Sequence, residues 1–142
     1  MNKIRVRLAD WQQDNADIRR IRDAVFVAEQ QVPPEQEWDA DDQSAVHFLA
    51  LEGDYPIGTA RLLGDGTIGR VSVLKDWRGL KVGDALMQAV IAEAHVRQLV
   101  PQKLSAQVHA TPFYERLGFH VVSEEFLEVG IPHVDMVRNG DV

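Results

Sequence analysis

The fold is decided by the stretch Arg70-Val-Ser-Val-Leu-Lys-Asp-Trp-Arg-Gly-Leu-Lys-Val-Gly-Asp-Ala-Leu-Met87. It begins with an alternating run typical of a β-strand, continues with a loop that holds two glycines, and ends at the start of an amphipathic helix. Such a loop directs unpaired backbone N–H groups and the positive end of a helix dipole at one position, where an anion is stabilised. The stretch therefore predicts a binding site for a phosphate group.

The charge of this stretch differs from that of the rest of the chain. Between positions 70 and 81, basic residues stand against a single acid, Asp76; they are Arg70, Lys75, Arg78 and Lys81. The whole chain has a formal net charge of −7 and a pI near 5.1. A cationic pocket in an acidic protein favours a phosphate-bearing small ligand over a nucleic acid, which needs a broad basic face. The alternative is that these cations only solvate a turn.

The sequence on both sides predicts a mixture of strands and helices. Alternation and turn signals predict strands at about residues 3–9, 46–52, 56–63, 67–74 and 103–109, with two more between 119 and 137 divided near Gly130 and Pro132. Apolar residues spaced by three and four predict helices at about 15–30, 82–99 and 111–117. The first helix is predicted to be capped by Asp14, and the last to end at Gly118.

The order of these elements predicts an α/β (α+β) fold in one domain over residues 1–142. Tight Gly-Asp turns join the strands between 46 and 74 into an antiparallel meander. A strand, a long helix and a further strand follow over about 67–109, which requires one right-handed parallel β-α-β crossover. The sheet is therefore predicted to be mixed and mostly antiparallel.

Composition narrows the class of protein. Of the 142 residues, 45% are hydrophobic and 26% are charged, which is ordinary for a globular protein in water. No apolar run is long enough to cross a bilayer, and residues 1–10 lack the apolar core of a signal peptide, so we expect a cytoplasmic protein with no membrane partner. The absence of cysteine excludes disulfides, thiolate metal sites and a cysteine nucleophile.

Some motifs resemble ligand-binding loops, but the residues around them do not support that function. Gly64-Asp-Gly-Thr-Ile-Gly69 matches the dinucleotide fingerprint, but a strand follows it instead of a helix, so we interpret it as a hairpin turn. Asp39-Ala-Asp-Asp-Gln43 starts like a calcium loop and lacks the glycine and the distal glutamate. The five histidines show no spacing of two ligands on one helix, so no metal is expected.

The loop within the opening stretch resembles that of a known family. Arg78-x-x-Lys81-x-Gly83, between a strand and a helix, is similar to the acyl-CoA pyrophosphate loop Arg/Gln-x-x-Gly-x-Gly/Ala of the GNAT N-acyltransferases. Downstream, Ala106-Gln107 and the run Phe113-Tyr-Glu-Arg-Leu-Gly-Phe119 resemble the second motif of that superfamily. The resemblance covers almost the whole chain and implies the GNAT fold, with helices on both faces of a mixed central sheet.

Further segments resemble the ElaA-type bacterial branch of this family. They are Val25-Phe26 with Glu29-Gln30 and Val32-Pro33, then Glu37-x-Asp39-x-x-Asp42, and near the end Gly130-Ile-Pro-His133 with Met136. One position departs from the family pattern, because Lys81 replaces the first loop glycine. If this position needs a positive φ, lysine costs about 1 kcal/mol, which its ammonium group offsets when it lies near the phosphates.

The resemblance implies an enzyme that moves an acetyl group from acetyl-CoA to a primary amine, without a metal. The loop would hold the diphosphate through its backbone amides and one guanidinium, at Arg78, Gly79, Leu80, Lys81, Val82, Gly83 and Asp84. The exposed backbone of Val71, Ser72 and Val73 would donate to the oxyanion. Tyr114 occupies the position of the family's general acid, which protonates the leaving thiolate; its alternative role is that of a packed helix tyrosine.

The residue that removes the proton of the amine stays open at this point. The candidates are Glu29, Glu37, Asp39, His109 and His133. All of them except His109 are also predicted to contact the acceptor, a small-molecule or peptide amine. The acidic stretch at 35–42 would attract a cationic acceptor, and its alternative role is that of a solvated loop.

Other functions fit the same scaffold. One is an acyl-CoA sensor or partner-binding module without catalytic activity, because a fold does not determine a function. Another is an acyl-transfer enzyme that makes signalling lactones, which predicts a longer chain and a docking surface for an acyl carrier. The acidic pI argues against nucleic acid as a partner, and the resemblance is compatible with a homodimer.

Overall fold

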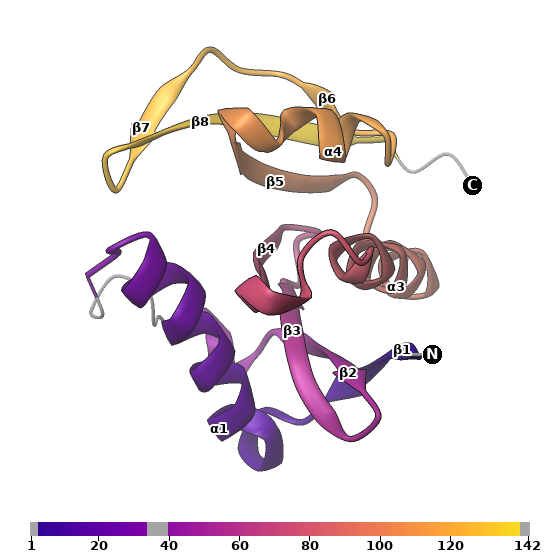
Figure 1. Cartoon of the computed structure of the whole chain (residues 1–142). Coiled ribbons are helices and arrows are strands. Elements are labelled where there is room, and N and C mark those ends of the chain that lie inside the picture. The colour runs from indigo at the N-terminus through magenta and orange to yellow at the C-terminus, as the bar shows by residue number, and fades with distance from the viewer. Residues whose placement is uncertain (1–2, 34–39, 140–142) are drawn as a thin grey trace.

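The structure is a computed structural model that describes residues 3–33 and 40–139. Its strands form two sheets, which Figure 1 shows one above the other. The first sheet contains, in this order, β1 (Ile4–Ala9), β2 (Val46–Glu52), β3 (Tyr55–Leu62) and β4 (Ile68–Val73). All neighbours in it are antiparallel, as the predicted meander requires.

The first sheet is covered on both faces because the side chains of its strands alternate. In β2, Leu49 faces α1 (Trp11–Arg22) and lies in one apolar cluster with Ile18. Phe48 faces the opposite side and joins the core formed with α3 (Val82–Val96). Figure 1 shows the two helices on opposite sides of β2 and β3. Burying one such side chain contributes about 1.5–3 kcal/mol, so each face holds its helix by packing.

The first helix begins earlier than predicted. Its cap is Asp10, whose carboxylate accepts hydrogen bonds from the backbone N–H groups of Gln12 and Gln13 at 2.8 and 3.2 Å. Asp14, the predicted cap, lies in the first turn, accepts the Asp10 N–H at 2.8 Å and pairs with Arg7. The prediction is wrong because two aspartates four residues apart both suit a cap, and the helix starts after the first of them.

After α1 the chain continues as a π-helical segment, η1 (Asp23–Glu29). Its wider turn carries a hydrogen bond from the Gln30 N–H to the Val25 carbonyl, at 3.2 Å. Val25 stays in the core, whereas Ala28, predicted on the same apolar stripe, is exposed. The wider turn rotates the end of the segment, so that Phe26 and Gln30 line a cavity.

The second sheet is formed by the C-terminal part of the chain. It contains β5 (Gln102–Gln107), β6 (His120–Val121), β7 (Phe126–Glu128) and β8 (Ile131–Arg138). β8 pairs with each of the others, always antiparallel. The prediction of two strands after residue 119 is wrong, because β6 is a separate strand of two residues. Two residues are too few to produce a recognisable alternation.

Short helical elements connect the two outer strands of the second sheet. After β5 the chain forms η4 (Val108–Ala110) and α4 (Thr111–Glu115). The helix ends near Gly118, as predicted, and this glycine adopts a φ of 95° and donates to the Glu115 carbonyl at 3.0 Å. None of the helices within residues 3–33 and 40–139 is long and apolar enough to cross a membrane.

The two sheets meet near one end of β4 and β5. Beyond this point the two strands separate, and each pairs only within its own sheet. The predicted parallel crossover through α3 is present as one bridge, between Thr67 and Lys103. Gly66 permits this approach, because its φ is 90° and a Cβ atom there would lie 2.5 Å from the Pro101 carbonyl oxygen. One cavity of the candidate site lies between β4 and β5, and the other lies between the end of β4, the start of α3 and the segment that follows β5.

Candidate active site

A β-bulge in β4 lies at the centre of the site. Thr59 pairs with Ser72 and Arg61 with Gly69, so two residues of β4 stand opposite one residue of β3. Arg70 within this bulge has a φ of 52°, a left-handed conformation that costs a non-glycine residue about 1 kcal/mol or more. A bulge bends its strand and takes backbone groups out of the ladder. This one bends β4 where the two sheets separate.

The first cavity, of about 700 Å³, lies at the N-terminal end of α3. Its walls come from the end of β4, the turn η3 (Lys75–Trp77) with its following loop, and the segment from η4 to α4. The predicted diphosphate-binding and oxyanion residues line it, namely Val71, Ser72, Val73, Arg78, Gly79, Lys81, Val82, Gly83 and Asp84. Leu80 was predicted with them and is not among the lining residues; it is about half exposed, at 52%.

The start of α3 suits an anion. Lys81 is the N-cap with a φ of 65°, and no side chain caps the helix there. The first backbone N–H groups of a helix have no partner within it, so those of Val82, Gly83 and Asp84 are available to a ligand in the cavity. The carboxylate of Asp84 accepts a hydrogen bond from Gln88 at 3.1 Å, along the helix. A diphosphate therefore fits this end of the helix, where Lys81 and Arg116 add positive charge.

Arg78 ties the loop to two other elements. Its guanidinium donates to both carboxylate oxygens of Glu29, at 2.8 and 2.6 Å, and its Nε donates to the Val73 carbonyl at 2.9 Å. The hydrogen bonds from Arg78 lower the pKa of Glu29. Glu29, predicted on the acceptor side, lines neither cavity. A carboxylate held in this way is a weak base.

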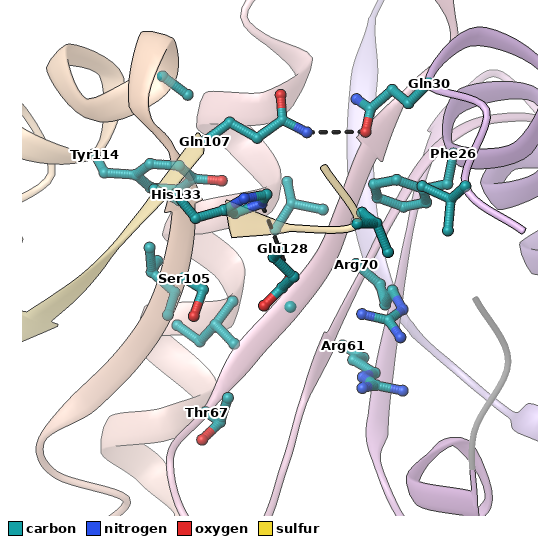
Figure 2. A pocket seen from close by; sticks show the side chains of 18 of the residues that line it. Phe26, Gln30, Arg61, Thr67, Arg70, Ser105, Gln107, Tyr114, Glu128 and His133 are labelled. Carbon is teal, nitrogen blue, oxygen red and sulfur yellow. Dashed lines mark hydrogen bonds and ion pairs between the residues drawn. The ribbon is translucent and has the colours of Figure 1, made fainter. Parts of the chain in front are cut away.

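The second cavity, of about 590 Å³, lies between the two sheets (Figure 2). β4 and β5 form two of its walls, and η1, α4 and the β7–β8 hairpin complete it. Gln30, Val71 and Ala110 line both cavities, so the two spaces meet beside the bulge. A long ligand in the first cavity would present its end to the second at this point.

Tyr114 reaches the second cavity from α4 (Figure 2). The ring is half-buried and packs edge-on against Phe113 and Phe119, with centroids 5.0 and 6.1 Å away. Burial raises the pKa of Tyr114 to about 12, because the phenolate would lose hydration. The phenol therefore stays protonated at neutral pH and can donate a hydrogen bond or a proton.

His133 and Glu128 face the same cavity from the β7–β8 hairpin (Figure 2). The Nδ1 atom of His133 lies 2.6 Å from the Ile131 carbonyl oxygen, and its Nε2 atom lies 3.8 Å from a carboxylate oxygen of Glu128. The ring stacks on Phe126 with centroids 6.1 Å apart. His133 was predicted to contact the acceptor, whereas Glu128 was missed, because only the register of the hairpin brings it beside the histidine.

His109 lies on the wall of the first cavity. Its Nε2 atom contacts the Gln107 side-chain oxygen at 2.7 Å, and the Gln107 amide donates to Gln30 at 2.8 Å. This chain of side chains crosses the region where the cavities meet (Figure 2 shows its glutamine pair). Two further acceptor residues of the prediction, Glu37 and Asp39, lie outside the residues that the structure describes.

Asp42, the last acid of the predicted acidic stretch, is buried and not solvated. It is 2% exposed, and its carboxylate accepts hydrogen bonds at 2.8 Å from both Arg22 and Arg61. Its carbonyl accepts from the Nε2 of His47 at 2.7 Å. The solvated-loop alternative is therefore wrong for Asp42, whose role is to hold α1 and β3 together beneath the site. Among the described residues, no group of acids and histidines could hold a metal ion.

The protein-family model of the GNAT acetyltransferase domain matches residues 10–139.

Two bacterial relatives are similar to the chain in sequence. The uncharacterized N-acetyltransferase YjcF of Bacillus subtilis is 38% identical over 123 residues, which cover 84% of this chain and 88% of the relative. Protein ElaA of Escherichia coli K12 is 38% identical over 128 residues, covering 84% and 83%.

Solved structures agree with the sequence comparison. The crystal structure of Escherichia coli ElaA superposes with a TM-score of 0.82 at 34% identity, over 98% of this chain and 100% of that one. The crystal structure of an acyl-CoA N-acyltransferase from Pseudomonas aeruginosa gives a TM-score of 0.84 at 32% identity, over 97% and 99%. The resemblance to the GNAT family and its ElaA-type branch is thereby confirmed.

Proposed function

The chain belongs to the GNAT acetyltransferase family, and we propose that it transfers an acetyl group from acetyl-CoA to a primary amine by direct attack within a ternary complex. Family membership supports acyltransferase activity. The proposal adds that the acyl group is acetyl, that the acceptor is a primary amine, and that the amine attacks directly. One observation carries it: the cavity at the N-terminal end of α3 and the second cavity meet at the bulge of β4.

The first task is to hold the diphosphate of acetyl-CoA. In the proposal it lies at the start of α3, where the amides of Val82, Gly83 and Asp84 donate to it. Lys81 and Arg116 add positive charge around the same end of the helix. Arg78 shapes the loop through Glu29 and the Val73 carbonyl. Much of the binding then comes from the backbone.

The second task is to stabilise the oxyanion that forms when the amine attacks the thioester. Val71 lines both cavities, so the acetyl group would lie beside the bulged backbone of β4. A backbone N–H fixed in place before the reaction donates without reorganising, and one such donor can lower a barrier by several kcal/mol. The pairing of β4 with β3 on both sides of the bulge holds Arg70 at its strained φ.

The third task is to protonate the leaving thiolate. Tyr114 lines the second cavity and remains a neutral phenol because its pKa is raised to about 12. A hydroxyl at this position donates to the sulfur as the carbon–sulfur bond breaks. Positioning of the two substrates supplies the rest of the rate, so few catalytic side chains are needed.

A thiol-release assay tests this function. The purified protein is incubated with acetyl-CoA and a panel of primary amines, and free CoA thiol is measured with a chromogenic disulfide. We expect amine-dependent thiol release with formation of the N-acetyl product. The alternative, an acyl-CoA sensor, predicts that acetyl-CoA raises the melting temperature while no amine gives turnover.

A further inference from the structure

We propose that Glu128 and His133 form the binding point for the ammonium group of the acceptor, and that His133 is the base that removes its proton. This inference rests on the proposed function, because it names the residues that prepare the amine for attack. Both side chains line the second cavity, which Tyr114 also lines. Figure 2 shows them pointing into that cavity from the β7–β8 hairpin.

The tautomer of His133 follows from its hydrogen bond. Its Nδ1 lies 2.6 Å from the Ile131 carbonyl oxygen, and a carbonyl oxygen can only accept a hydrogen bond. Nδ1 therefore carries the hydrogen. In the neutral ring the lone pair is then on Nε2, the nitrogen nearer to Glu128.

When His133 is neutral, the pair lacks a donor between its two acceptor atoms. Nε2 of neutral His133 and a carboxylate oxygen of Glu128 lie 3.8 Å apart, and neither carries a hydrogen. An ammonium nitrogen about 2.9 Å from each atom closes a triangle on that side and donates to both. The geometry thus suits a primary ammonium group, which supplies the charge and the hydrogens that the pair is missing.

The exposure of the two residues suits a division of roles. His133 is 6% exposed and its ring stacks on Phe126, so its orientation is fixed. The carboxylate side chain of Glu128 is 52% exposed, at the rim of the cavity, where it can attract a cation from solvent. After proton transfer, the imidazolium of His133 faces the carboxylate of Glu128, which stabilises the product of that step.

The other described candidates for the base are engaged elsewhere. Glu29 is held by Arg78 and lines neither cavity. His109 contacts Gln107 and belongs to the wall of the first cavity. The charged or titratable residues that line the second cavity beside the pair are Tyr114, Arg61 and Arg70.

The proposed transfer releases one proton to solvent overall. The ammonium group gives one proton to Nε2 of His133, which passes it to solvent, and the free amine attacks the thioester carbon. The new carbon–nitrogen bond leaves a second proton on nitrogen. As the carbon–sulfur bond breaks, Tyr114 protonates the thiolate and is reprotonated by that second proton. The net products are the amide, CoA thiol and one proton in solution.

Three variants of the full chain test the pair. His133→Asn retains an amide donor for the Ile131 carbonyl and removes the ring nitrogen that acts as base. Glu128→Gln removes the charge and keeps the shape of an exposed side chain. Glu125→Gln is the matched control, since Glu125 is an exposed acid just before β7 that lines neither cavity. The probe amines are phenethylamine, 1,5-diaminopentane and glucosamine.

We expect His133→Asn to lower kcat/KM for the amine at least a hundredfold at pH 7, with acetyl-CoA affinity unchanged. Without a base only the neutral amine reacts, so its residual rate rises about tenfold per pH unit with the fraction of free amine. Wild type, which accepts the ammonium form and deprotonates it in the site, should lack this slope, whereas a histidine with a merely structural role predicts the same slope in both proteins. Glu128→Gln raises KM for the amine about tenfold or more with a smaller change in kcat, and Glu125→Gln behaves like wild type.

Two results would overturn the inference while the proposed function stands: an amine kcat/KM of His133→Asn within threefold of wild type, or equal KM values for Glu128→Gln and Glu125→Gln. If His133→Asn does not fold, Glu128→Gln decides the binding point, and a wild-type rate that rises about tenfold per pH unit with the fraction of free amine would overturn the base.

If wild type binds acetyl-CoA and acetylates none of the amines, the proposed function fails, and nitrogen-edited NMR of the histidine side chains decides the pair. Amine-dependent shifts of the Nε2 signal of His133 that Glu128→Gln abolishes would support the binding point. No shift at 50 mM of any probe amine would overturn it.

Discussion

At the scale of single residues, Lys81 shows how one side chain can carry a cost and a use. Its φ of 65° is a left-handed conformation, which explains why the family pattern has glycine at this position. The sequence alone indicates this possibility, because lysine replaces that glycine. The residue caps α3 and its side chain is exposed at the wall of the first cavity. Backbone strain and favourable charge therefore meet in one position.

Replacing Lys81 separates these two effects. Lys81→Gly relieves the strain, about 1 kcal/mol, and removes the charge, so we expect an unchanged or higher melting temperature and severalfold weaker binding of CoA. Lys81→Gln keeps the strain and removes the charge, so it weakens CoA equally without raising the melting temperature. Calorimetric titration at low and high salt measures the affinities. Equal CoA affinity in all three proteins would show that the lysine does not contact the phosphates.

Tyr114 gives a second prediction at this scale. Tyr114→Phe keeps the ring that packs between Phe113 and Phe119 and removes the hydroxyl that the proposal uses to protonate the thiolate. We expect acetyl-CoA affinity to stay the same and kcat to fall at least tenfold. Because the pKa of Tyr114 is about 12, its ionisation should not reduce wild-type activity below about pH 11. Steady-state kinetics that give an unchanged kcat would remove Tyr114 from the mechanism.

At the scale of elements, the contact between α1 and the first sheet depends on a buried group of charges. Arg22 of α1 and Arg61 of β3 both donate to Asp42, which precedes β2. Burial by itself would raise the pKa of Asp42, but the hydrogen bonds and charges of the two arginines outweigh it, so the pKa is lowered. The carboxylate therefore stays charged in the folded protein.

Removing that charge should destabilise the fold. Asp42→Asn leaves two buried guanidinium groups without their shared carboxylate, and we expect a loss of about 3–5 kcal/mol in the free energy of unfolding. Asp54→Asn is the control, since its ion pair with Arg5 is fully exposed on the Asp54 side and is expected to contribute nothing measurable. Urea unfolding of the three proteins gives the values. Equal stability of Asp42→Asn and wild type would contradict the structural role.

His47 adds a pH dependence to the same cluster. It is 1% exposed, and burial lowers its pKa. The unfolded chain binds a proton at His47 below about pH 6.5, whereas the folded chain binds it only at lower pH. The contribution of His47 to the free energy of unfolding is therefore fully present above about pH 6.5. It decreases as the pH falls below that value, by at most about 1.4 kcal/mol per pH unit. His47→Gln keeps a donor to the Asp42 carbonyl and should flatten this dependence between pH 6.5 and 5. His120→Gln, at an exposed histidine, should leave the pH dependence unchanged. Thermal melts in which the melting temperature varies with pH equally in both variants would refute the assignment.

Local patterns predicted most of the elements, and long-range pairing explains the misses. The meander and α3 follow from alternation and periodicity, although Val96, predicted on the apolar stripe of α3, is 77% exposed and ends the helix on the solvent side. The π-helical turn of η1 and the two-residue β6 leave no periodic signal. That most of residues 78–84 line one cavity could be predicted because they are contiguous in the chain. The pair of Glu128 and His133 could not, because it depends on hairpin register.

At the scale of the whole molecule, the candidate site exists because β4 and β5 separate and leave space between the two sheets. The bridge between Thr67 and Lys103 joins the two halves, and beyond it β4 and β5 belong to separate ladders. Neither half contains the site alone: the first supplies the bulge and the start of α3, and the second supplies Tyr114 and His133. A ligand that spans the divide should hold the halves together, so saturation with acetyl-CoA at a hundredfold excess over Kd would add about 2.7 kcal/mol of stability.

The measurement that tests the central claim most directly is calorimetric titration of acetyl-CoA into wild type, Gly83→Ala and Gly83→Glu. A Cβ atom at Gly83 would lie 3.6 Å from the Phe113 ring, an ordinary contact, so Gly83→Ala should fold and bind. Gly83→Glu places a carboxylate in the first turn of α3, where the diphosphate is proposed to lie. We expect one binding site in wild type and in Gly83→Ala, and at least a hundredfold weaker binding in Gly83→Glu at an unchanged melting temperature. No binding heat in wild type, or equal affinity in Gly83→Glu, would contradict diphosphate binding at this helix.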